Sequence, residues 1–295
     1  MPEPSATQPH VHDDAPTDPV RGVDPFLGKV IEGRYRVERK LGAGGMGRVY
    51  LGRHLRTGVE LAIKVIDVPP HRAEEMQARC QKEAQAMMAV RSSHVAHALD
   101  FGSLRTGGFF LVMEYLRGED LEQLVTREGP LPWARLGPMA LQLCRGLGSA
   151  HEQGILHRDI KPSNCFRVAL DGNPDHVKII DFGIARDIDG ATGPTQEGMF
   201  VGTAAYLAPE IIFGEPATVR SDLYSVGVTL YKLLTGVVPF RGESREEVFH
   251  KLVRDLAEAP SRVAPCFVWS APVRDSLVTH YGLPADRIET LPPSL

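Results

Sequence analysis

Residues 155–164 read ILHRDIKPSN, which places charged and amide side chains directly after an apolar Ile-Leu pair. Asp159 follows a His-Arg pair, and Lys161 and Asn164 come two and five positions after it. An acid surrounded by bases and an amide at this density is more typical of a catalytic or binding loop than of a solvated turn. This stretch is therefore interpreted as part of a functional site.

A second acidic loop follows soon after the first. Asp181 begins the sequence DFG directly after the apolar, strand-like residues VKII. Two carboxylates and an amide on neighbouring loops supply the hard oxygen ligands that Mg²⁺ prefers. One carboxylate can bind metal while another accepts a proton from a hydroxyl, and Lys161 can neutralise charge on a transferring phosphoryl group. Each motif alone is compatible with a surface turn, but their combination predicts a site for chemistry.

A glycine-rich segment lies near the start of the chain. Residues 41–50 read LGAGGMGRVY, with Gly42, Gly44 and Gly47 in G-x-G-x-x-G spacing. Glycines let backbone N–H groups approach phosphates closely, although a plain hairpin turn has the same composition. A dinucleotide-binding βαβ unit needs a helix directly after the glycines. The strand-like sequence RVYLGRH follows instead, which argues against that unit.

Lys64 lies within LAIKV, between apolar neighbours. A lone Lys in a strand is usually a solvated edge charge. The apolar flanks predict a partly buried ammonium here, and such a group needs an anionic partner. The partner is either a phosphate held by the glycine turn or a carboxylate of the following helix, where Glu83 is the best candidate.

Periodicity divides the chain into a β-rich first part and a helical second part. Residues 1–25, rich in Pro, Asp, Thr and His, are predicted to be a disordered tail. The first lobe covers about 30–116, a hinge lies near 114–118, and the second lobe covers about 117–295. Strands are expected within 30–52 on both sides of the glycines, at 59–68, around 95–101 and around 109–115. Helices are expected at 72–90, 136–154 and 222–236, the last deep in the core.

Composition excludes several classes of protein. The net charge of −4 equals the excess of acids in residues 1–25, so the rest of the chain is balanced and suggests neither a nucleic-acid groove nor a polybasic membrane anchor. We expect no signal peptide and no membrane span, and a cytoplasmic location with reduced thiols. The cysteines are too far apart for a zinc site: Cys80, Cys144, Cys165 and Cys266.

The ordered set of motifs resembles the protein kinase family, and most of all the bacterial eukaryotic-like Ser/Thr kinases. GAGGMG, AIK, KEA, HRDIKPSN, DFG and APE occur in the family's order over roughly residues 34–250. The resemblance implies an α+β, bilobal protein kinase fold, with a small β-rich N-lobe that carries one key helix and a larger, mainly α-helical C-lobe. It also implies ATP and Mg²⁺ as substrate and cofactor.

The resemblance assigns roles to the catalytic residues. Lys64 would hold the α- and β-phosphates of ATP and pair with Glu83. Asp159 would be the catalytic base, and Lys161 would contact the γ-phosphate. The implied Mg²⁺ ligands are Asn164 and Asp181.

The implied ATP-binding residues lie on the glycine-rich turn, its flanking strands and the hinge. Met113 would be the gatekeeper, Glu114 to Leu116 would bond adenine through the backbone, and Asp120 would reach the ribose. The full set is Leu41, Gly42, Ala43, Gly44, Gly45, Met46, Gly47, Val49, Ala62, Lys64, Met113, Glu114, Leu116 and Asp120.

The loop between DFG and APE resembles an activation loop. The sequence HRDxKPxN looks like Ser/Thr specificity, and Thr203 in GTAAY would bond near Asp159 and Lys161. A phosphothreonine on this loop could pair with Arg158 and order the loop. Thr195 is the first candidate for that site and Thr192 the second.

Three further acids receive expected roles. Glu197 stands where many relatives carry a second Thr, and we hypothesise that it partly mimics a phosphate. Asp222 would support the backbone of the HRD motif. Glu210 of APE would pair with an Arg, for which Arg287 in LPADR is the candidate. After about residue 265 the resemblance implies further helices that close the C-lobe, and the sequence matches the family pattern less well there.

The resemblance implies a Ser/Thr protein kinase that acts on protein substrates and autophosphorylates its activation loop, with a transient homodimer for that step. A pseudokinase and a small-molecule kinase of related fold are the alternatives. Pseudokinases usually lose Lys64, Asp159 or Asp181, all of which are present, and the long loop before APE looks suited to a peptide.

Overall fold

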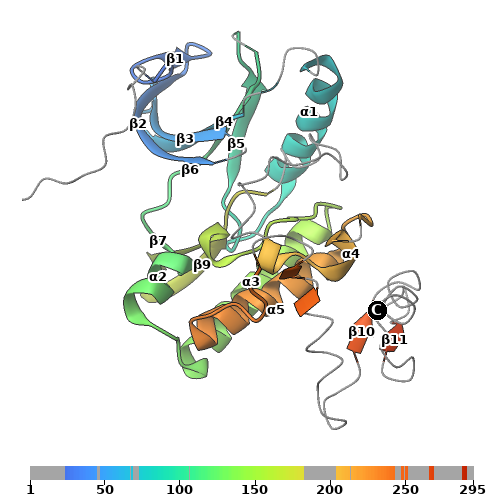
Figure 1. The fold of residues 1–295 in the computed structure, drawn as a ribbon. Coiled ribbons are helices and arrows are strands. Elements are labelled where there is room, and N and C mark those ends of the chain that lie inside the picture. Colours follow the sequence, from blue (N-terminus) through green and yellow to red (C-terminus); the bar gives the residue numbers. More distant parts are fainter. Residues whose placement is uncertain are drawn as a thin grey trace, which may run out of the picture.

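The computed structural model describes residues 24–44, 47–66, 68, 73–105, 107–182, 204–212, 214–242, 247–248, 250–251, 266–268 and 288–290. These residues form a β-rich lobe above a mainly helical lobe, as expected from the sequence (Figure 1). The α+β class and the two-lobed architecture are thereby confirmed.

The N-lobe is a six-stranded antiparallel sheet with the strand order β1-β2-β3-β4-β6-β5, flanked by one helix, α1 (Ala73–Ala89). The helix is rich in Ala, Gln and Glu, which favour helix formation, and it agrees with the predicted range of 72–90. The strands are β1 (Val30–Ile31), β2 (Tyr35–Gly44), β3 (Gly47–His54), β4 (Glu60–Ile66), β5 (Ala98–Ser103) and β6 (Phe109–Glu114).

Side chains alternate between the faces of this sheet, and the two faces belong to two different cores. On β4, Ile63 and Val65 pack with Val37 and Tyr50 in a cluster confined to the N-lobe. Ile66 belongs to the large cluster that continues into the C-lobe. Lys64, in register with Val49 of β3, therefore lies on the face that looks toward the C-lobe.

The C-lobe combines helices with a small three-stranded sheet, β7-β8-β9. α3 packs on β9 and on α5, and these contacts frame the loop that carries Asp159. The elements are β7 (Gly118–Asp120), α2 (Leu121–Glu128), α3 (Trp133–His151), η2 (Pro162–Asn164), β8 (Cys165–Leu170), β9 (Asn173–Ile179), η4 (Ala204–Tyr206), α4 (Pro209–Ile212) and α5 (Val219–Thr235).

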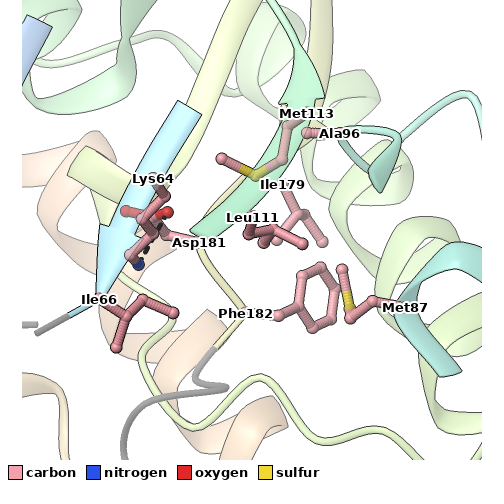
Figure 2. Close-up of a pocket in the computed structure, with 9 residues that line it drawn as sticks. All are labelled: Lys64, Ile66, Met87, Ala96, Leu111, Met113, Ile179, Asp181 and Phe182. Carbon is pink, nitrogen blue, oxygen red and sulfur yellow. Dashed lines mark hydrogen bonds and ion pairs between the residues drawn. The ribbon is translucent and has the colours of Figure 1, made fainter. Parts of the chain in front are cut away.

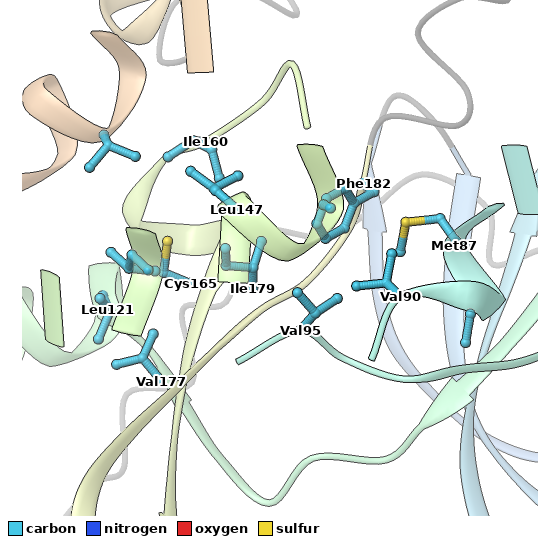
Figure 3. Close-up of a cluster of buried hydrophobic side chains, with 14 of the residues drawn as sticks. Met87, Val90, Val95, Leu121, Leu147, Ile160, Cys165, Val177, Ile179 and Phe182 are labelled. Carbon is cyan, nitrogen blue, oxygen red and sulfur yellow. The ribbon is translucent and has the colours of Figure 1, made fainter. Parts of the chain in front are cut away.

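The large hydrophobic core joins the lobes next to the site (Figure 3). Val95, from the segment after α1, forms a parallel bridge with Ile179 of β9. Ala96 N–H donates to Ile179 O (2.8 Å), and Ile179 N–H donates to His94 O (2.9 Å). This bonded joint fixes the end of the N-lobe helix relative to the strand that leads into Asp181.

α5 departs from one expectation. Its start has a capping box formed by Thr218 and Ser221, and Gly236 ends it in the left-handed conformation at φ 79°. One side packs on α3 and η4, but Leu223 and Tyr231 are exposed, at 46% and 45%. The prediction that this helix lies deep in the core is wrong for that side, because no described element covers it.

The structure differs from the boundaries expected from the sequence at both ends of the described chain. Asp24 and Pro25, assigned to the tail by composition, are placed against the N-lobe, and the preceding residues lie outside the described part. At the other end, β10 (Cys266–Val268) pairs in parallel with β11 (Ile288–Thr290). These described residues are strands rather than the helices expected there, and their β-branched and aromatic side chains favour strands. LPADR lies outside the described residues.

Candidate active site

The loop that carries Asp159 is held by the side chains predicted to act with it. Asn164 Nδ2 donates to the backbone oxygen of Asp159 at 2.8 Å and to its Oδ2 at 3.0 Å. Lys161 Nζ lies 3.0 Å from the same Oδ2. Asp159, Lys161 and Asn164 thus form one hydrogen-bonded cluster, with the carboxylate fixed by two donors.

Asp222 of α5 supports this loop from below. Its carboxylate accepts hydrogen bonds from the backbone N–H groups of His157 and Arg158, both at 2.8 Å, and from His151 Nε2 at 2.8 Å. Burial by itself would raise the pKa of Asp222, but these hydrogen bonds outweigh it and the pKa is lowered. They also hold Arg158 at φ 63°, a left-handed conformation that needs support. The expected supporting role of Asp222 is confirmed.

His157 connects the Asp159 loop to the Asp181 loop. Its ring is fully buried, Nδ1 accepts from Asp159 N–H (3.2 Å), and Nε2 faces Ile180 O (2.9 Å). Because Nδ1 accepts an N–H and Nε2 faces a carbonyl oxygen, the ring proton lies on Nε2, which donates to Ile180. Burial lowers the pKa of His157, which favours this neutral form. The ring also packs on Phe182, with centroids 4.6 Å apart.

Lys64 and Asp181 bring the two lobes together at the centre of the site (Figure 2). Lys64 Nζ lies 3.0 Å from Asp181 Oδ1, and the side chains are 10% and 30% exposed. The partly buried ammonium therefore has an anionic partner, as predicted, although Asp181 was not one of the two partners expected for it. Asp181 adopts φ 60° at the point where the chain turns out of β9. Glu83 lies half-buried on α1, and its pairing with Lys64 stays a prediction.

A cavity of about 10 Å³ lies behind this ion pair (Figure 2). This volume is about that needed to hold one water molecule. Apolar side chains from α1, β6 and the Asp181 loop line the cavity beside the charged pair. The lining residues are Lys64, Ile66, Met87, Ala96, Leu111, Met113, Ile179, Asp181 and Phe182.

The predicted hinge begins where β6 ends. Met113 is in register with Ala62 of β4, so these two predicted adenine-site residues are neighbours. Glu114 Oε1 accepts from His97 N–H (2.8 Å) and from Lys178 Nζ (2.6 Å). Lys178, on β9 of the C-lobe, therefore holds the side chain of the hinge residue Glu114 in place. This role was not predicted from the sequence, where the only signal is a single Lys within the apolar run VKII.

Asp120 has a local structural task. Its side chain accepts from Gln123 N–H at 2.8 Å and so caps the N-terminus of α2. Burial raises the pKa of Asp120, and the hydrogen bonds from Gln123 and Glu122 oppose that rise. A contact with the ribose stays a prediction.

The glycine-rich turn joins β2 to β3, and its glycines differ in what they require. Gly47 has φ 132°, and a Cβ at this position would lie 2.0 Å from Val65 O. Gly42 has no positive φ, and a Cβ there would meet nothing within 4 Å. Leu41 and Ala43 are exposed beside it. Gly45 and Met46 lie outside the described residues, and the role of the turn in phosphate binding stays a prediction.

The donor set near Asp181 fits Mg²⁺ better than a metal bound by protein alone. Among the residues that the structure describes, no three His, Cys, Asp or Glu side chains come together as a metal site. Asn164 Nδ2 is committed to Asp159, which leaves Oδ1 of that amide, with the Asp181 carboxylate, as hard oxygen donors. Mg²⁺ usually takes one or two protein ligands and completes its shell with phosphates and water.

Most of the expected activation loop, residues 183–203, lies outside the described part of the chain. Thr192, Thr195, Glu197 and Thr203 lie outside the described residues, as does Arg287, the candidate partner of Glu210. Glu210 itself is 4% exposed and accepts from Ser221 Oγ at 2.7 Å. Burial raises the pKa of Glu210, and the Ser221 hydrogen bond only partly offsets the rise.

Comparison with known proteins decides the family. The family model for the protein kinase domain matches residues 35–275. This chain belongs to the protein kinase family. It is 38% identical over 245 residues to the serine/threonine-protein kinase pkn3 of Myxococcus xanthus, covering 82% of this chain and 45% of pkn3. It is 37% identical over 232 residues to the serine/threonine-protein kinase PknB of Mycobacterium leprae, covering 78% of this chain and 37% of PknB.

Solved structures agree with the family assignment. The PknI kinase domain of Mycobacterium tuberculosis matches with a TM-score of 0.56 and 27% identity, over 72% of this chain and 78% of PknI's. The chain spans less than half the length of pkn3 and of PknB. No helix in the described part of the chain is long and apolar enough to span a membrane. The kinase family implies ATP as the phosphoryl donor and proteins as acceptors.

Proposed function

We propose that this protein is a Ser/Thr protein kinase, which transfers the γ-phosphoryl group of ATP to Ser and Thr hydroxyls of proteins. The observation that carries the proposal is the cluster formed by Asp159, Lys161 and Asn164, which is bonded to the loop of the Lys64–Asp181 ion pair. Ile180 N–H, next to Asp181, donates to Asn164 O at 3.0 Å. A pseudokinase has no need for all of these groups. Their shared location supports turnover rather than ATP binding alone.

In the proposed reaction, the acceptor oxygen attacks the γ-phosphorus as Asp159 takes the hydroxyl proton. The new O–P bond forms while the bond to the bridging oxygen of ADP breaks. Two donors already hold the Asp159 carboxylate, so it needs little reorganisation. Lys161 stabilises charge on the transferring group, and Lys64 binds the α- and β-phosphates. Bound Mg²⁺ would neutralise phosphate charge, held by Asn164 and Asp181.

The acceptors include the protein's own activation loop in this proposal. Thr195 is the first expected site and Thr192 the second, with transfer between two transiently paired copies. Arg158 sits beside Asp159, so a phosphothreonine bound there would couple the loop to the catalytic base. Glu197 partly mimics that charge. A Glu197→Gln variant should therefore have lower basal activity than the wild type, and unchanged activity would remove this part of the proposal.

The experiment is phosphosite mapping by mass spectrometry. The full chain is incubated with Mg²⁺ and ATP beside an Asp159→Asn variant that serves as the inactive control. Phosphate on Thr195 or Thr192 of the wild type, absent from the variant, is the expected result. ATP binding without phosphate on the chain or on any added protein would instead indicate a pseudokinase or a kinase that needs an upstream activator. Transfer confined to small-molecule hydroxyls would indicate the related small-molecule kinases.

A further inference from the structure

Residues 24–31, called here the N-terminal strap, run along the edge of the hairpin formed by β2 and β3. Gly28 N–H donates to Val37 O at 3.0 Å, and Val37 N–H donates to Lys29 O at 2.9 Å. Within the strap, β1 adds Ile31 opposite Tyr35. The strap is therefore bonded to the same strand that leads into the glycine-rich turn.

The first described residue of the chain, Asp24, touches both strands of this hairpin. Its carboxylate accepts from Tyr50 Oη on β3, at 2.9 Å and 3.0 Å to its two oxygens, and lies 3.8 Å from Lys40 Nζ on β2. Lys40 and Tyr50 are register partners near the turn. Tyr50 is fully buried and the Asp24 side chain is only 14% exposed. A hydrogen bond to a charged, poorly hydrated acceptor is among the stronger ones.

An aromatic contact extends the attachment to the residue next to Gly47. Phe26 N–H donates to Asp24 Oδ1 at 3.0 Å, which fixes the bend of the strap. The Phe26 ring lies 6.0 Å from the Tyr50 ring, and the Arg48 guanidinium lies 5.0 Å above it. Arg48 directly follows Gly47, so the strap reaches the base of the glycine-rich turn.

The side chains of the strap contact the face of the hairpin that points away from the nucleotide site. Tyr50 packs with Ile63 and Val65, whereas Val49 is in register with Lys64. Because side chains alternate along a strand, Val49 points to the Lys64 side and Tyr50 to the opposite side. The strap can therefore move the hairpin without touching ATP.

We propose that the N-terminal strap is a positioning element for ATP binding, with the Asp24–Tyr50 hydrogen bond as its latch. Asp24 fixes both strands that carry the glycine-rich turn, so it sets where the backbone N–H groups of that turn meet the phosphates. Asp24 and Tyr50 are positioning residues and not catalytic ones. This inference rests on the proposed function, because it requires that the glycine-rich turn covers ATP.

The test measures ATP affinity, in the full chain with Mg²⁺, for Asp24→Ala, Tyr50→Phe and the double variant. Losing one hydrogen bond to a charged group should weaken ATP binding by about three- to tenfold in each single variant. The double variant should bind about as weakly as Asp24→Ala, because that change already removes the bond lost in Tyr50→Phe, together with the Phe26 and Lys40 contacts. The KM for ATP should rise in parallel, and the KM for a protein acceptor should not change.

Glu32→Ala is the matched control, because Glu32 is an exposed acid of the β1–β2 turn and is not part of the latch. It should bind ATP like the wild type. The proposal is overturned if both latch variants bind ATP normally, even with a lowered melting temperature, or if their effects multiply in the double variant. Binding is measured apart from transfer, so a wild type that binds ATP but transfers no phosphate refutes the proposed function and leaves this test intact. A wild type that binds no ATP refutes both.

Discussion

Lys64 and Asp181 are 117 residues apart in the chain, yet Nζ of the first lies 3.0 Å from Oδ1 of the second. One comes from the N-lobe sheet and the other from the loop after β9 of the C-lobe. The pair therefore marks the place where phosphates bound by Lys64 would meet a cation bound by Asp181. Each lobe therefore supplies one partner of this ion pair.

Replacing Lys64 by Met should abolish most phosphoryl transfer. The change removes the proposed phosphate contact and leaves the Asp181 carboxylate without the ammonium that faces it. Loss of one such electrostatic contact costs about 10²- to 10³-fold in kcat. The measurement is the rate of phosphate incorporation into a protein acceptor. Lys232→Met is the control, since Lys232 pairs with Glu122 on the C-lobe, and equal rates in both variants would contradict the assignment.

The glycines of the turn should differ sharply in their tolerance of a side chain. Gly47→Ala places a Cβ 2.0 Å from Val65 O at φ 132°, which should destabilise the protein by about 1–3 kcal/mol and raise the KM for ATP. Gly42→Ala meets no atom within 4 Å and should change stability little. Urea unfolding and ATP kinetics on the two variants check this. Equal effects would mean that the turn is not held against β4 as described.

A closed ring of alternating charges should stabilise the C-lobe below the hinge. Arg135 and Arg167 both pair with Asp175, and Arg167 also pairs with Glu119. Arg127 and Glu128 then link Glu119 back to Arg135. Asp175→Asn leaves two arginines facing a neutral amide, so we expect a loss of about 1–2 kcal/mol in the free energy of unfolding. The loss should shrink at high salt.

The control for the ring is Glu60→Gln. Glu60 also pairs with two arginines, Arg53 and Arg117, but their side chains are 42% and 79% exposed, and exposed pairs contribute little. Urea unfolding of both variants at low and high salt provides the comparison. If Asp175→Asn were no less stable than Glu60→Gln at low salt, the ring would contribute nothing.

The contribution of Glu210 to the free energy of unfolding should change with pH in the direction opposite to that of an ordinary ion-paired acid. Burial raises its folded pKa, so the folded state binds the proton more tightly than the unfolded state does. The stability it contributes is complete below the unfolded pKa of about 4.3 and is lost as pH rises through the folded pKa. A Glu210→Gln variant should not show this loss. Its free energy of unfolding should therefore increase relative to that of the wild type as pH rises above about 4.3.

The free energy of unfolding of both proteins, measured from pH 4 to pH 8, checks this prediction. Asp222, whose pKa is lowered, acts in a separate window: its contribution is present above its unfolded pKa of about 3.9 and is lost as pH falls below that. If Arg287 pairs with Glu210, as the sequence predicts, the wild type would instead be the more stable protein at neutral pH. Arg287→Met would then remove that advantage.

Local patterns in the sequence predicted much of the site. The alternation around the glycines, the apolar strand of Lys64 and the density of HRDIKPSN each reflect nearest-neighbour chemistry, and the structure places these elements as expected. The contacts missed were long-range ones. Neither Lys178 nor Asp24 stands in a distinctive local pattern, and each gains its role only through a partner, Glu114 or Tyr50, brought close by the fold. α5 was misjudged because its apolar sequence does not reveal which side is covered.

The sharpest test of the proposed kinase activity compares the wild type with Asp159→Asn in two assays, ATP affinity and the rate of phosphate transfer to Ser and Thr of a protein acceptor. Asn keeps the size of Asp159 and an acceptor for Asn164, but it cannot take the hydroxyl proton. We predict unchanged ATP affinity and a rate lower by about 10²-fold or more. Equal transfer rates in the two proteins would contradict the role of Asp159 as catalytic base.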